Sequence, residues 1–340
     1  MAVTLQTIQN DLSDAQTAPV YLIQGTDQYL LDQARQLFVN SVPKEDQAMN
    51  LAQFDMHEVP LSVALDDARS MPFFGDKRTV LIDNAFFLSG EQNRYKIEHQ
   101  VDELLLYLDH PEPQTTLVIF APYDKLDRRK KVTKRLQEQS QHLAFGELTE
   151  KDILGMIQHR LRTSGYDMTN EAQQLLGRLT NYNLTVMMSE LDKLMLFAVN
   201  DKKITETMVS ASVTKTLNES IFDLIDLLLQ KKLSQAVNLY HQLLVSGEEP
   251  LRLHGAMLSQ FRLLLQVKAA TTSEQGTATA LKVHPYRVKL ARQTGRKLAY
   301  KNIAQAYLGL VDMEKQLKRT ARDPELLFEL FVLRYQTITA

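Results

Sequence analysis

The sequence predicts an α/β domain with a parallel sheet, followed by an all-α region. Short apolar segments alternate with segments of helical periodicity up to residue 146, which is the rhythm of a parallel α/β sheet. Beyond that point apolar residues recur at helical spacing and strand-like segments nearly vanish. A chain of 340 residues is also too long for one typical core. We therefore predict an α/β domain over 1–146, a small helical domain over 147–213 and a helical bundle over 214–340.

Five strands are expected in the first domain. Each is a short apolar segment, and they cover residues 20–23, 52–56, 79–82, 116–120 and 142–145. The fourth of them, Thr116 to Phe120, is a continuous apolar run typical of a strand buried on both faces. Amphipathic helices are expected over residues 27–42, 61–70, 93–108 and 127–139.

The remaining chain reads as helices. A capping box formed by Thr149 and Asp152 predicts the start of a helix that ends near Thr163. Further helices are expected over residues 171–179, 185–199, 205–212, 221–228, 234–244, 251–270, 285–293, 302–317 and 324–338. A polar loop is expected over 271–279.

Composition places the chain in the ordinary globular class. The hydrophobic share is 44% and the charged share 24%, values typical of soluble proteins. No apolar run is long enough to cross a bilayer, and the first residues lack the pattern of a signal peptide. The absence of cysteine excludes disulfides and thiolate metal sites and suits a reducing cytoplasm. A cytoplasmic protein is therefore expected.

Charge is distributed unevenly along the chain. Residues 251–323 hold fourteen Lys or Arg and four Asp or Glu, whereas the whole chain has a net charge of -2. The excess favours an anionic partner such as nucleic acid, and solvated helix faces are the alternative. Four cations near one helix end are candidate contacts for DNA or for other subunits, although they also suit the helix dipole: Lys315, Lys318, Arg319 and Arg322. A second basic segment, residues 125–135, has the same two interpretations.

The chemistry needed for nucleotide hydrolysis is missing from the predicted sheet. The turn after the first strand, residues 24–30, holds one glycine where a P-loop needs two, and it lacks a Lys-Ser or Lys-Thr pair. Asp27 adds negative charge where a phosphate would lie. The eight histidines include no pair spaced for a metal on one helix face, and no serine lies in a Gly-x-Ser-x-Gly elbow. No catalytic, cofactor-binding or metal-binding residue is predicted.

The segment Ser70-Met71-Pro72-Phe73-Phe74 lies between a predicted helix and a predicted strand. Pro72 fixes its own φ and biases Met71 towards an extended conformation. A short, stiff corner of this kind can project Met71, Phe73 and Phe74 outward together. Ordinary core packing of these side chains is the alternative.

An α/β domain without a nucleotide site, a small helical lid and a helical bundle together describe a degenerate AAA+ module, with a RecA-like parallel sheet and a C-terminal collar. Short segments along most of the chain match a known family: 21–25, 29–30, Ser-Met-Pro-Phe-Phe-Gly-Asp-Lys-Arg at 70–78, 125–131, 183–184, 189–194, 221–224, 247–250, 260–262, 284–286 and 323–326. Taken together in this order and spacing, they make the sequence resemble the delta subunit family of the bacterial DNA polymerase III clamp loader.

This resemblance implies a non-catalytic subunit of the DNA polymerase III holoenzyme, a nucleotidyltransferase complex. Such a subunit binds the sliding clamp (the beta subunit) and holds its ring open for loading onto primer-template DNA. It needs no cofactor, because ATP is hydrolysed by other loader subunits, and the collar joins it to the ATPase and delta-prime subunits.

The family's clamp-binding element maps onto Ser70, Met71, Pro72, Phe73 and Phe74. Phe73-Phe74 departs from the Leu-Phe pair that is frequent in the family. Asp76, Lys77 and Arg78 are expected to widen the contact. Two alternatives stay open: an active P-loop-like ATPase of the AAA+ class, and direct DNA binding through residues 251–323.

Overall fold

The computed structural model describes residues 4–13, 17–72, 75, 77–90, 97–213, 217–283, 285–296 and 298–339. The chain divides into two compact units, residues 1–147 and residues 148–340. Within the described part of the chain, no helix is both long and apolar enough to cross a membrane.

A five-stranded parallel sheet forms the centre of the first unit, with strand order β2-β3-β4-β1-β5. The strands are β1 (Val20–Gln24), β2 (Leu51–Asp55), β3 (Arg78–Asp83), β4 (Thr115–Ala121) and β5 (Gln141–Ala144). Every residue of β4 is buried, as its continuous apolar sequence predicts for a central strand. The predicted fold class, a parallel α/β domain followed by helices, is confirmed.

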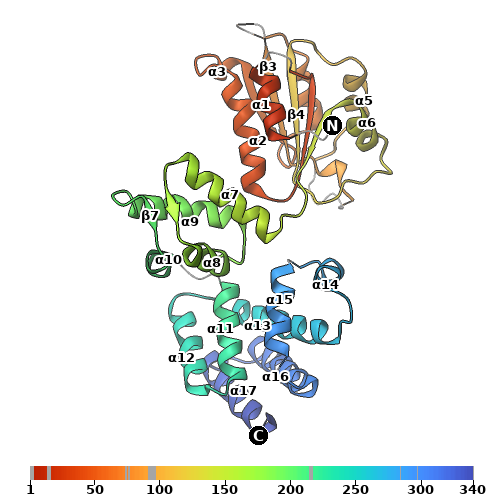
Figure 1. Cartoon of the computed structure of the whole chain (residues 1–340). Coiled ribbons are helices and arrows are strands. Elements are labelled where there is room, and N and C mark those ends of the chain that lie inside the picture. Colours follow the sequence, from red (N-terminus) through yellow and green to blue (C-terminus); the bar gives the residue numbers. More distant parts are fainter. Residues whose placement is uncertain are drawn as a thin grey trace. The chain divides into compact units, whose positions relative to one another are not determined.

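Helices cover both faces of this sheet (Figure 1). Alternate residues of β1 face opposite layers, because successive side chains of a strand point to opposite sides. Tyr21 and Ile23 pack with α1 (Leu5–Ser13) and α2 (Gln28–Ser41), whereas Val20 and Leu22 belong to the cluster on the other face. That second face carries α4 (Leu61–Ala68), α5 (Val101–Asp109) and α6 (Lys131–Gln139). Two short elements, α3 (Gln47–Asn50) and the 3-10 helix η1 (Phe86–Leu88), complete the unit.

Two helix starts were predicted wrongly. The helix expected over 93–108 begins at Val101; residues 97–100 are not helical, and 91–96 lie outside the described residues. The helix expected from 127 begins at Lys131, because the Asp127 carboxylate accepts a hydrogen bond from the Arg129 backbone N–H at 3.1 Å and closes a turn there. Helix α1 was not predicted at all.

The described residues of the second unit are helical apart from loops and two short paired strands, β6 (Asp167–Met168) and β7 (Lys203–Ile204). Its first helices are α7 (Glu150–Thr163), α8 (Asn170–Leu179), α9 (Leu184–Phe197) and α10 (Glu206–Ser212). The capping box predicted at Thr149 and Asp152 is present, with both reciprocal hydrogen bonds.

The C-terminal bundle contains α11 (Leu217–Leu229), α12 (Leu233–Val245), α13 (Pro250–Ala269), α14 (Glu274–Leu281), α15 (Pro285–Gly295), α16 (Tyr300–Arg319) and α17 (Pro324–Thr339). The prediction of a polar loop over 271–279 is wrong, because helix α14 begins at Glu274 within this segment. Ser273 caps this helix by accepting a hydrogen bond from the Gly276 backbone N–H at 3.1 Å.

Contacts join the two groups of helices in the second unit. The rings of Tyr182 and Tyr286 meet edge to face at 4.7 Å, and Lys289 lies 3.9 Å from Glu150. The predicted division of this unit near residue 213 stays a prediction.

Candidate protein-binding site

The predicted corner begins where α4 ends. One face of α4 is fully buried against the sheet through Leu61, Ala64, Leu65 and Ala68, which anchors the helix. After Ala68 the chain leaves the helix. The Ser70 hydroxyl donates to the Asp66 carbonyl at 3.0 Å, and the Ser70 N–H donates to the Asp67 carbonyl at 3.0 Å. The next residue, Met71, is 78% exposed, the highest value among the exposed large apolar side chains of the described chain.

The structure describes three of the five predicted site residues: Ser70 and Met71 are exposed, and Pro72 is half-buried. Phe73 and Phe74 lie outside the described residues, as does Asp76. Gly75, with φ of 72°, is in the left-handed region that glycine adopts without steric cost.

Arg78 differs from its predicted role as an exposed contact. Its guanidinium donates two hydrogen bonds to the Asp67 carboxylate, at 2.9 and 2.7 Å, and a third to the Met49 carbonyl at 2.7 Å. Only 12% of the Arg78 side chain is exposed. Arg78 therefore stabilises the base of the corner. Lys77 is exposed and donates to the Thr17 hydroxyl.

Two further exposed apolar side chains lie on α4 and on the neighbouring helix α5, and they were not singled out from the sequence. Val63 on α4 is 45% exposed, and Leu106 on α5 is 65% exposed. Helices α4 and α5 pack beside each other on the same face of the sheet. Both could have been predicted to be exposed, because Val63 and Leu106 are apolar residues that lie outside the buried face of their helices.

The turn after β1 contains a tightly packed glycine and a capping carboxylate. A side chain at Gly25 would place its Cβ 2.8 Å from the Cβ of Phe145, so the glycine is required by the packing of Phe145. The Asp27 carboxylate accepts a hydrogen bond from the Leu30 N–H at 3.1 Å and caps α2. Burial raises the pKa of Asp27 above its ordinary value. The N-terminus of α2, where a P-loop protein binds phosphate, is thus occupied by the chain's own carboxylate.

A buried acid at the end of β3 was also missed from the sequence. Asp83 is 8% exposed and accepts hydrogen bonds from Arg35, at 2.9 Å from Nη1, and from Gln53 at 2.6 Å. The guanidinium of Arg35 also lies 4.4 Å from the ring centre of Phe120. A metal-bound nucleotide would need this carboxylate free, and here it is neutralised by an arginine. No group of three metal-binding side chains occurs among the described residues.

Some cations of the basic segment 125–135 make contacts within the fold, whereas Lys125, Arg128, Lys131 and Lys134 are exposed. Lys130 donates to the carbonyls of Phe87 and Ser89 at 2.8 and 2.7 Å, and Arg129 pairs with Asp127 at 2.9 Å. A phosphate would have to displace the contacts of Lys130 and Arg129, but it could reach the exposed cations directly. A nucleic-acid contact by this segment stays a prediction.

The four C-terminal cations are all exposed, at the end of α16 and in the segment that follows it. Lys318 pairs with Glu314 at 2.8 Å, and Arg322 donates to the Gln316 side chain at 2.8 Å.

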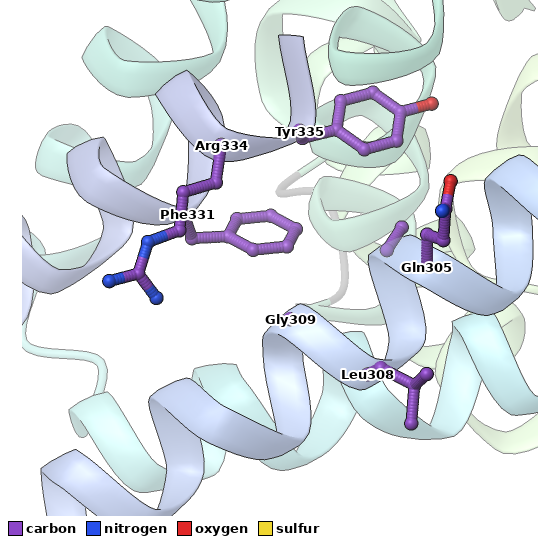
Figure 2. A pocket seen from close by; sticks show the side chains of 7 residues that line it. Gln305, Leu308, Gly309, Phe331, Arg334 and Tyr335 are labelled. Carbon is purple, nitrogen blue, oxygen red and sulfur yellow. The ribbon is translucent and has the colours of Figure 1, made fainter. Parts of the chain in front are cut away.

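A groove of about 300 Å³ lies between α16 and α17 (Figure 2). Phe331 and Tyr335 on α17 line it together with Gln305 and Leu308 on α16. A side chain at Gly309 would place its Cβ 3.2 Å from the Phe331 ring, so the glycine allows this close helix contact. Leu308 is 64% exposed beside the groove, and α17 also exposes Leu326, Leu330 and Leu333. This is a second apolar surface, well separated in sequence from the first.

Comparison with known proteins agrees with this architecture. The profile described as "DNA polymerase III, delta subunit" matches residues 21–145, and that of the "DNA polymerase III delta subunit, C-terminal domain" matches residues 218–335. A third profile, described as "middle domain", matches residues 149–211.

Two curated proteins are similar along the chain. DNA polymerase III subunit delta of Bacillus subtilis is 34% identical over 331 residues, covering 96% of this chain and 95% of the relative. A probable DNA polymerase III subunit delta of Aquifex aeolicus is 23% identical over 253 residues, covering 72% and 69%. The solved structure of the Bacillus subtilis DNA clamp loader delta protein superposes with a TM-score of 0.72 at 33% identity, covering 98% of this chain and 99% of that one.

The fold defines an α/β protein with a helical C-terminal unit, a carboxylate-capped turn after β1 and an exposed Met71 in the corner that follows α4. The chain belongs to the DNA polymerase III delta subunit family.

Proposed function

We propose that this chain is the clamp-loader subunit that binds the sliding clamp through the corner Ser70–Phe74 and holds the ring open for loading onto primed DNA. The observation that carries the proposal is Met71, an apolar side chain that is 78% exposed directly after α4, a helix anchored to the sheet by one buried face. A contiguous exposed apolar patch marks an interaction site, and a few buried anchor residues carry most of the binding energy of an interface. Phe73 and Phe74 would enter the same pocket of the clamp.

Energetics require a contact wider than three side chains. Burying Met71, Phe73 and Phe74 contributes roughly 1.5–3 kcal/mol each. Association costs about 4–15 kcal/mol in lost freedom, so these residues alone give little net affinity. We assign the additional contact to Val63 and Leu106, which expose apolar surface on the adjacent helices α4 and α5.

Opening of the clamp follows from differential affinity. A ligand shifts a conformational equilibrium only by the difference between its affinities for the two states. The corner must therefore fit the open ring better than the closed ring.

We further propose that the chain is not catalytic by itself. The cap formed by Asp27 and the ion pair between Arg35 and Asp83 occupy the positions that a nucleotide and its metal would need. ATP hydrolysis then falls to other subunits of the complex, in the cytoplasm. Saturable binding of ATP by the purified chain would favour the alternative, an active ATPase.

The C-terminal bundle is proposed as the collar that joins the ATPase and delta-prime subunits. The groove between α16 and α17 offers apolar surface for such a contact. Lys315, Lys318, Arg319 and Arg322 are exposed beside the end of α16 and are proposed to contact DNA or a neighbouring subunit in the assembled loader. The three-domain division at residues 146 and 213 belongs to the same proposal.

A pull-down with the cognate sliding clamp tests the site. The double variant Phe73→Ala plus Phe74→Ala should lose clamp capture and keep the circular dichroism spectrum of the parent chain. Leu196→Ala, at a 76% exposed residue of α9 in the other unit, is the matched control and should capture the clamp normally. Full capture by the double variant would refute the assignment.

A further inference from the structure

Helix α4, which leads into the corner, is held at both ends by side chains that lie outside the helix. At its start the N-cap residue is Pro60, which offers no side-chain acceptor. The imidazole of His99 takes that place, with its Nδ1 3.1 Å from the Leu61 backbone nitrogen. An unpaired N–H of the first helical turn is thereby satisfied by a residue far along the chain.

The tautomer of His99 follows from its second contact. Its Nε2 lies 3.0 Å from the Met56 carbonyl oxygen, which can only accept a hydrogen bond. The ring proton therefore resides on Nε2, and Nδ1 is the acceptor for the Leu61 N–H. The rings of Phe86 and Phe87 pack around the imidazole, with centroids at 5.0 and 5.5 Å. Burial lowers the pKa of His99, and the neighbouring His57 acts in the same direction, so the acceptor stays unprotonated at neutral pH.

The other end of α4 is held by Arg78. Asp67 lies in the last turn of α4, whereas Arg78 is the first residue of β3, on the far side of the corner. The two hydrogen bonds between their side chains close the corner at its base. The backbone N–H of Arg78 donates to the Gln114 carbonyl at 2.8 Å, and its side chain reaches the Met49 carbonyl, so Arg78 is itself tied to the sheet.

We propose that His99 and Arg78 are positioning residues for the clamp-binding surface: they hold the two ends of α4, and with them Val63, Ser70 and Met71, in the positions that the clamp recognises. This inference rests on the proposed function. A binding surface that is ordered before binding avoids the entropy cost of ordering it during binding. Loss of the His99 contact or of the Arg78 contact therefore lowers clamp affinity, although neither residue touches the clamp.

Asp67→Asn in the full chain is the principal test, because the amide keeps the size of the side chain and removes its charge. Amide hydrogen exchange of the last turn of α4 in the free chain should accelerate about tenfold. Clamp affinity, measured by surface plasmon resonance, should fall about tenfold, with the loss mainly in the association rate. Asp66→Asn is the matched control, since Asp66 is the adjacent acid, its side chain is 75% exposed, and its ion pair with Arg69 at 3.3 Å is solvent-exposed and does not reach β3. It should leave the exchange of α4 unchanged.

His99→Phe tests the other end of the helix. Phenylalanine keeps the aromatic packing against Phe86 and Phe87 and removes the acceptor, so the Leu61 amide should exchange faster and clamp affinity should fall. Ile8→Val is the control for general loss of stability, because Ile8 is fully buried against the opposite face of the sheet. This variant should lower the urea midpoint and leave clamp affinity unchanged.

The outcomes separate the inference from the proposed function. If the parent chain does not bind the clamp, the proposed function fails. The hydrogen-exchange data then still show whether the contacts of His99 and Arg78 stabilise α4. Clamp affinity that stays at the parental value while α4 exchanges faster would overturn the inference and leave the proposed function standing. Unchanged exchange of α4 would overturn it as well. If Asp67→Asn does not fold, the same measurements are made on Arg78→Lys. Lysine keeps the positive charge but cannot form the bidentate pair of hydrogen bonds with the Asp67 carboxylate.

Discussion

Met71→Ala is the substitution whose effect the structure defines best. Complete burial of a methionine side chain contributes roughly 1.5–3 kcal/mol. Met71 is 78% exposed in the free chain, so most of that contribution remains to be gained on binding. If the clamp covers it, the loss should be about 1–2 kcal/mol, a roughly 5- to 30-fold rise in the Kd. Because the side chain makes little contact within the chain, the free energy of unfolding should change by less than about 0.5 kcal/mol.

Isothermal titration of the purified clamp with each variant measures the effect, and urea unfolding measures stability. Leu196→Ala serves as the control, since Leu196 is an equally exposed apolar residue at 76% in the other unit. It should leave both the Kd and the urea midpoint unchanged. A Kd for Met71→Ala within twofold of the parent would show that the clamp does not bury this side chain, and the corner would then not be the binding site.

Four further predictions concern other parts of the chain. Asp27→Ala should cost about 1 kcal/mol of stability through the lost cap on α2 and should create no ATP binding, as calorimetry with ATP can check. Gly177→Ala should destabilise the second unit by about 1–3 kcal/mol in urea unfolding, because its Cβ would lie 2.5 Å from the Tyr182 ring. Burial holds the pKa of His254 below its ordinary value of 6.5. As the pH falls, His254 is therefore protonated in the unfolded chain before it is protonated in the folded chain. The free energy of unfolding should decrease below about pH 6.5, and it should decrease less steeply in His254→Gln. Binding of primed DNA by the isolated chain should be weak and should decline steeply with salt in a fluorescence anisotropy titration; tight binding that resists salt would contradict this.

Local sequence patterns predicted most of the architecture. The apolar run of β4, the buried stripe of α4 and the capping box at Thr149 each specify their own conformation, since the information lies within a few neighbouring residues. Two of the errors fell where a side chain changes the local preference. Ser273 starts a helix inside a polar segment, and Asp127 closes a turn ahead of α6.

The same distinction applies to the binding site. Sequence alone determined that the turn after β1 lacks phosphate chemistry and that an apolar, proline-containing corner follows α4. Only the tertiary structure decided that the Arg78 side chain turns inward to Asp67, and that His99 caps α4 from 38 residues away. It also decided that Val63 on α4 and Leu106 on α5 remain exposed, although the two helices pack against each other. The physical reason is range: periodicity and caps act within a few residues, whereas burial and ion pairing depend on which distant segments the sheet brings together.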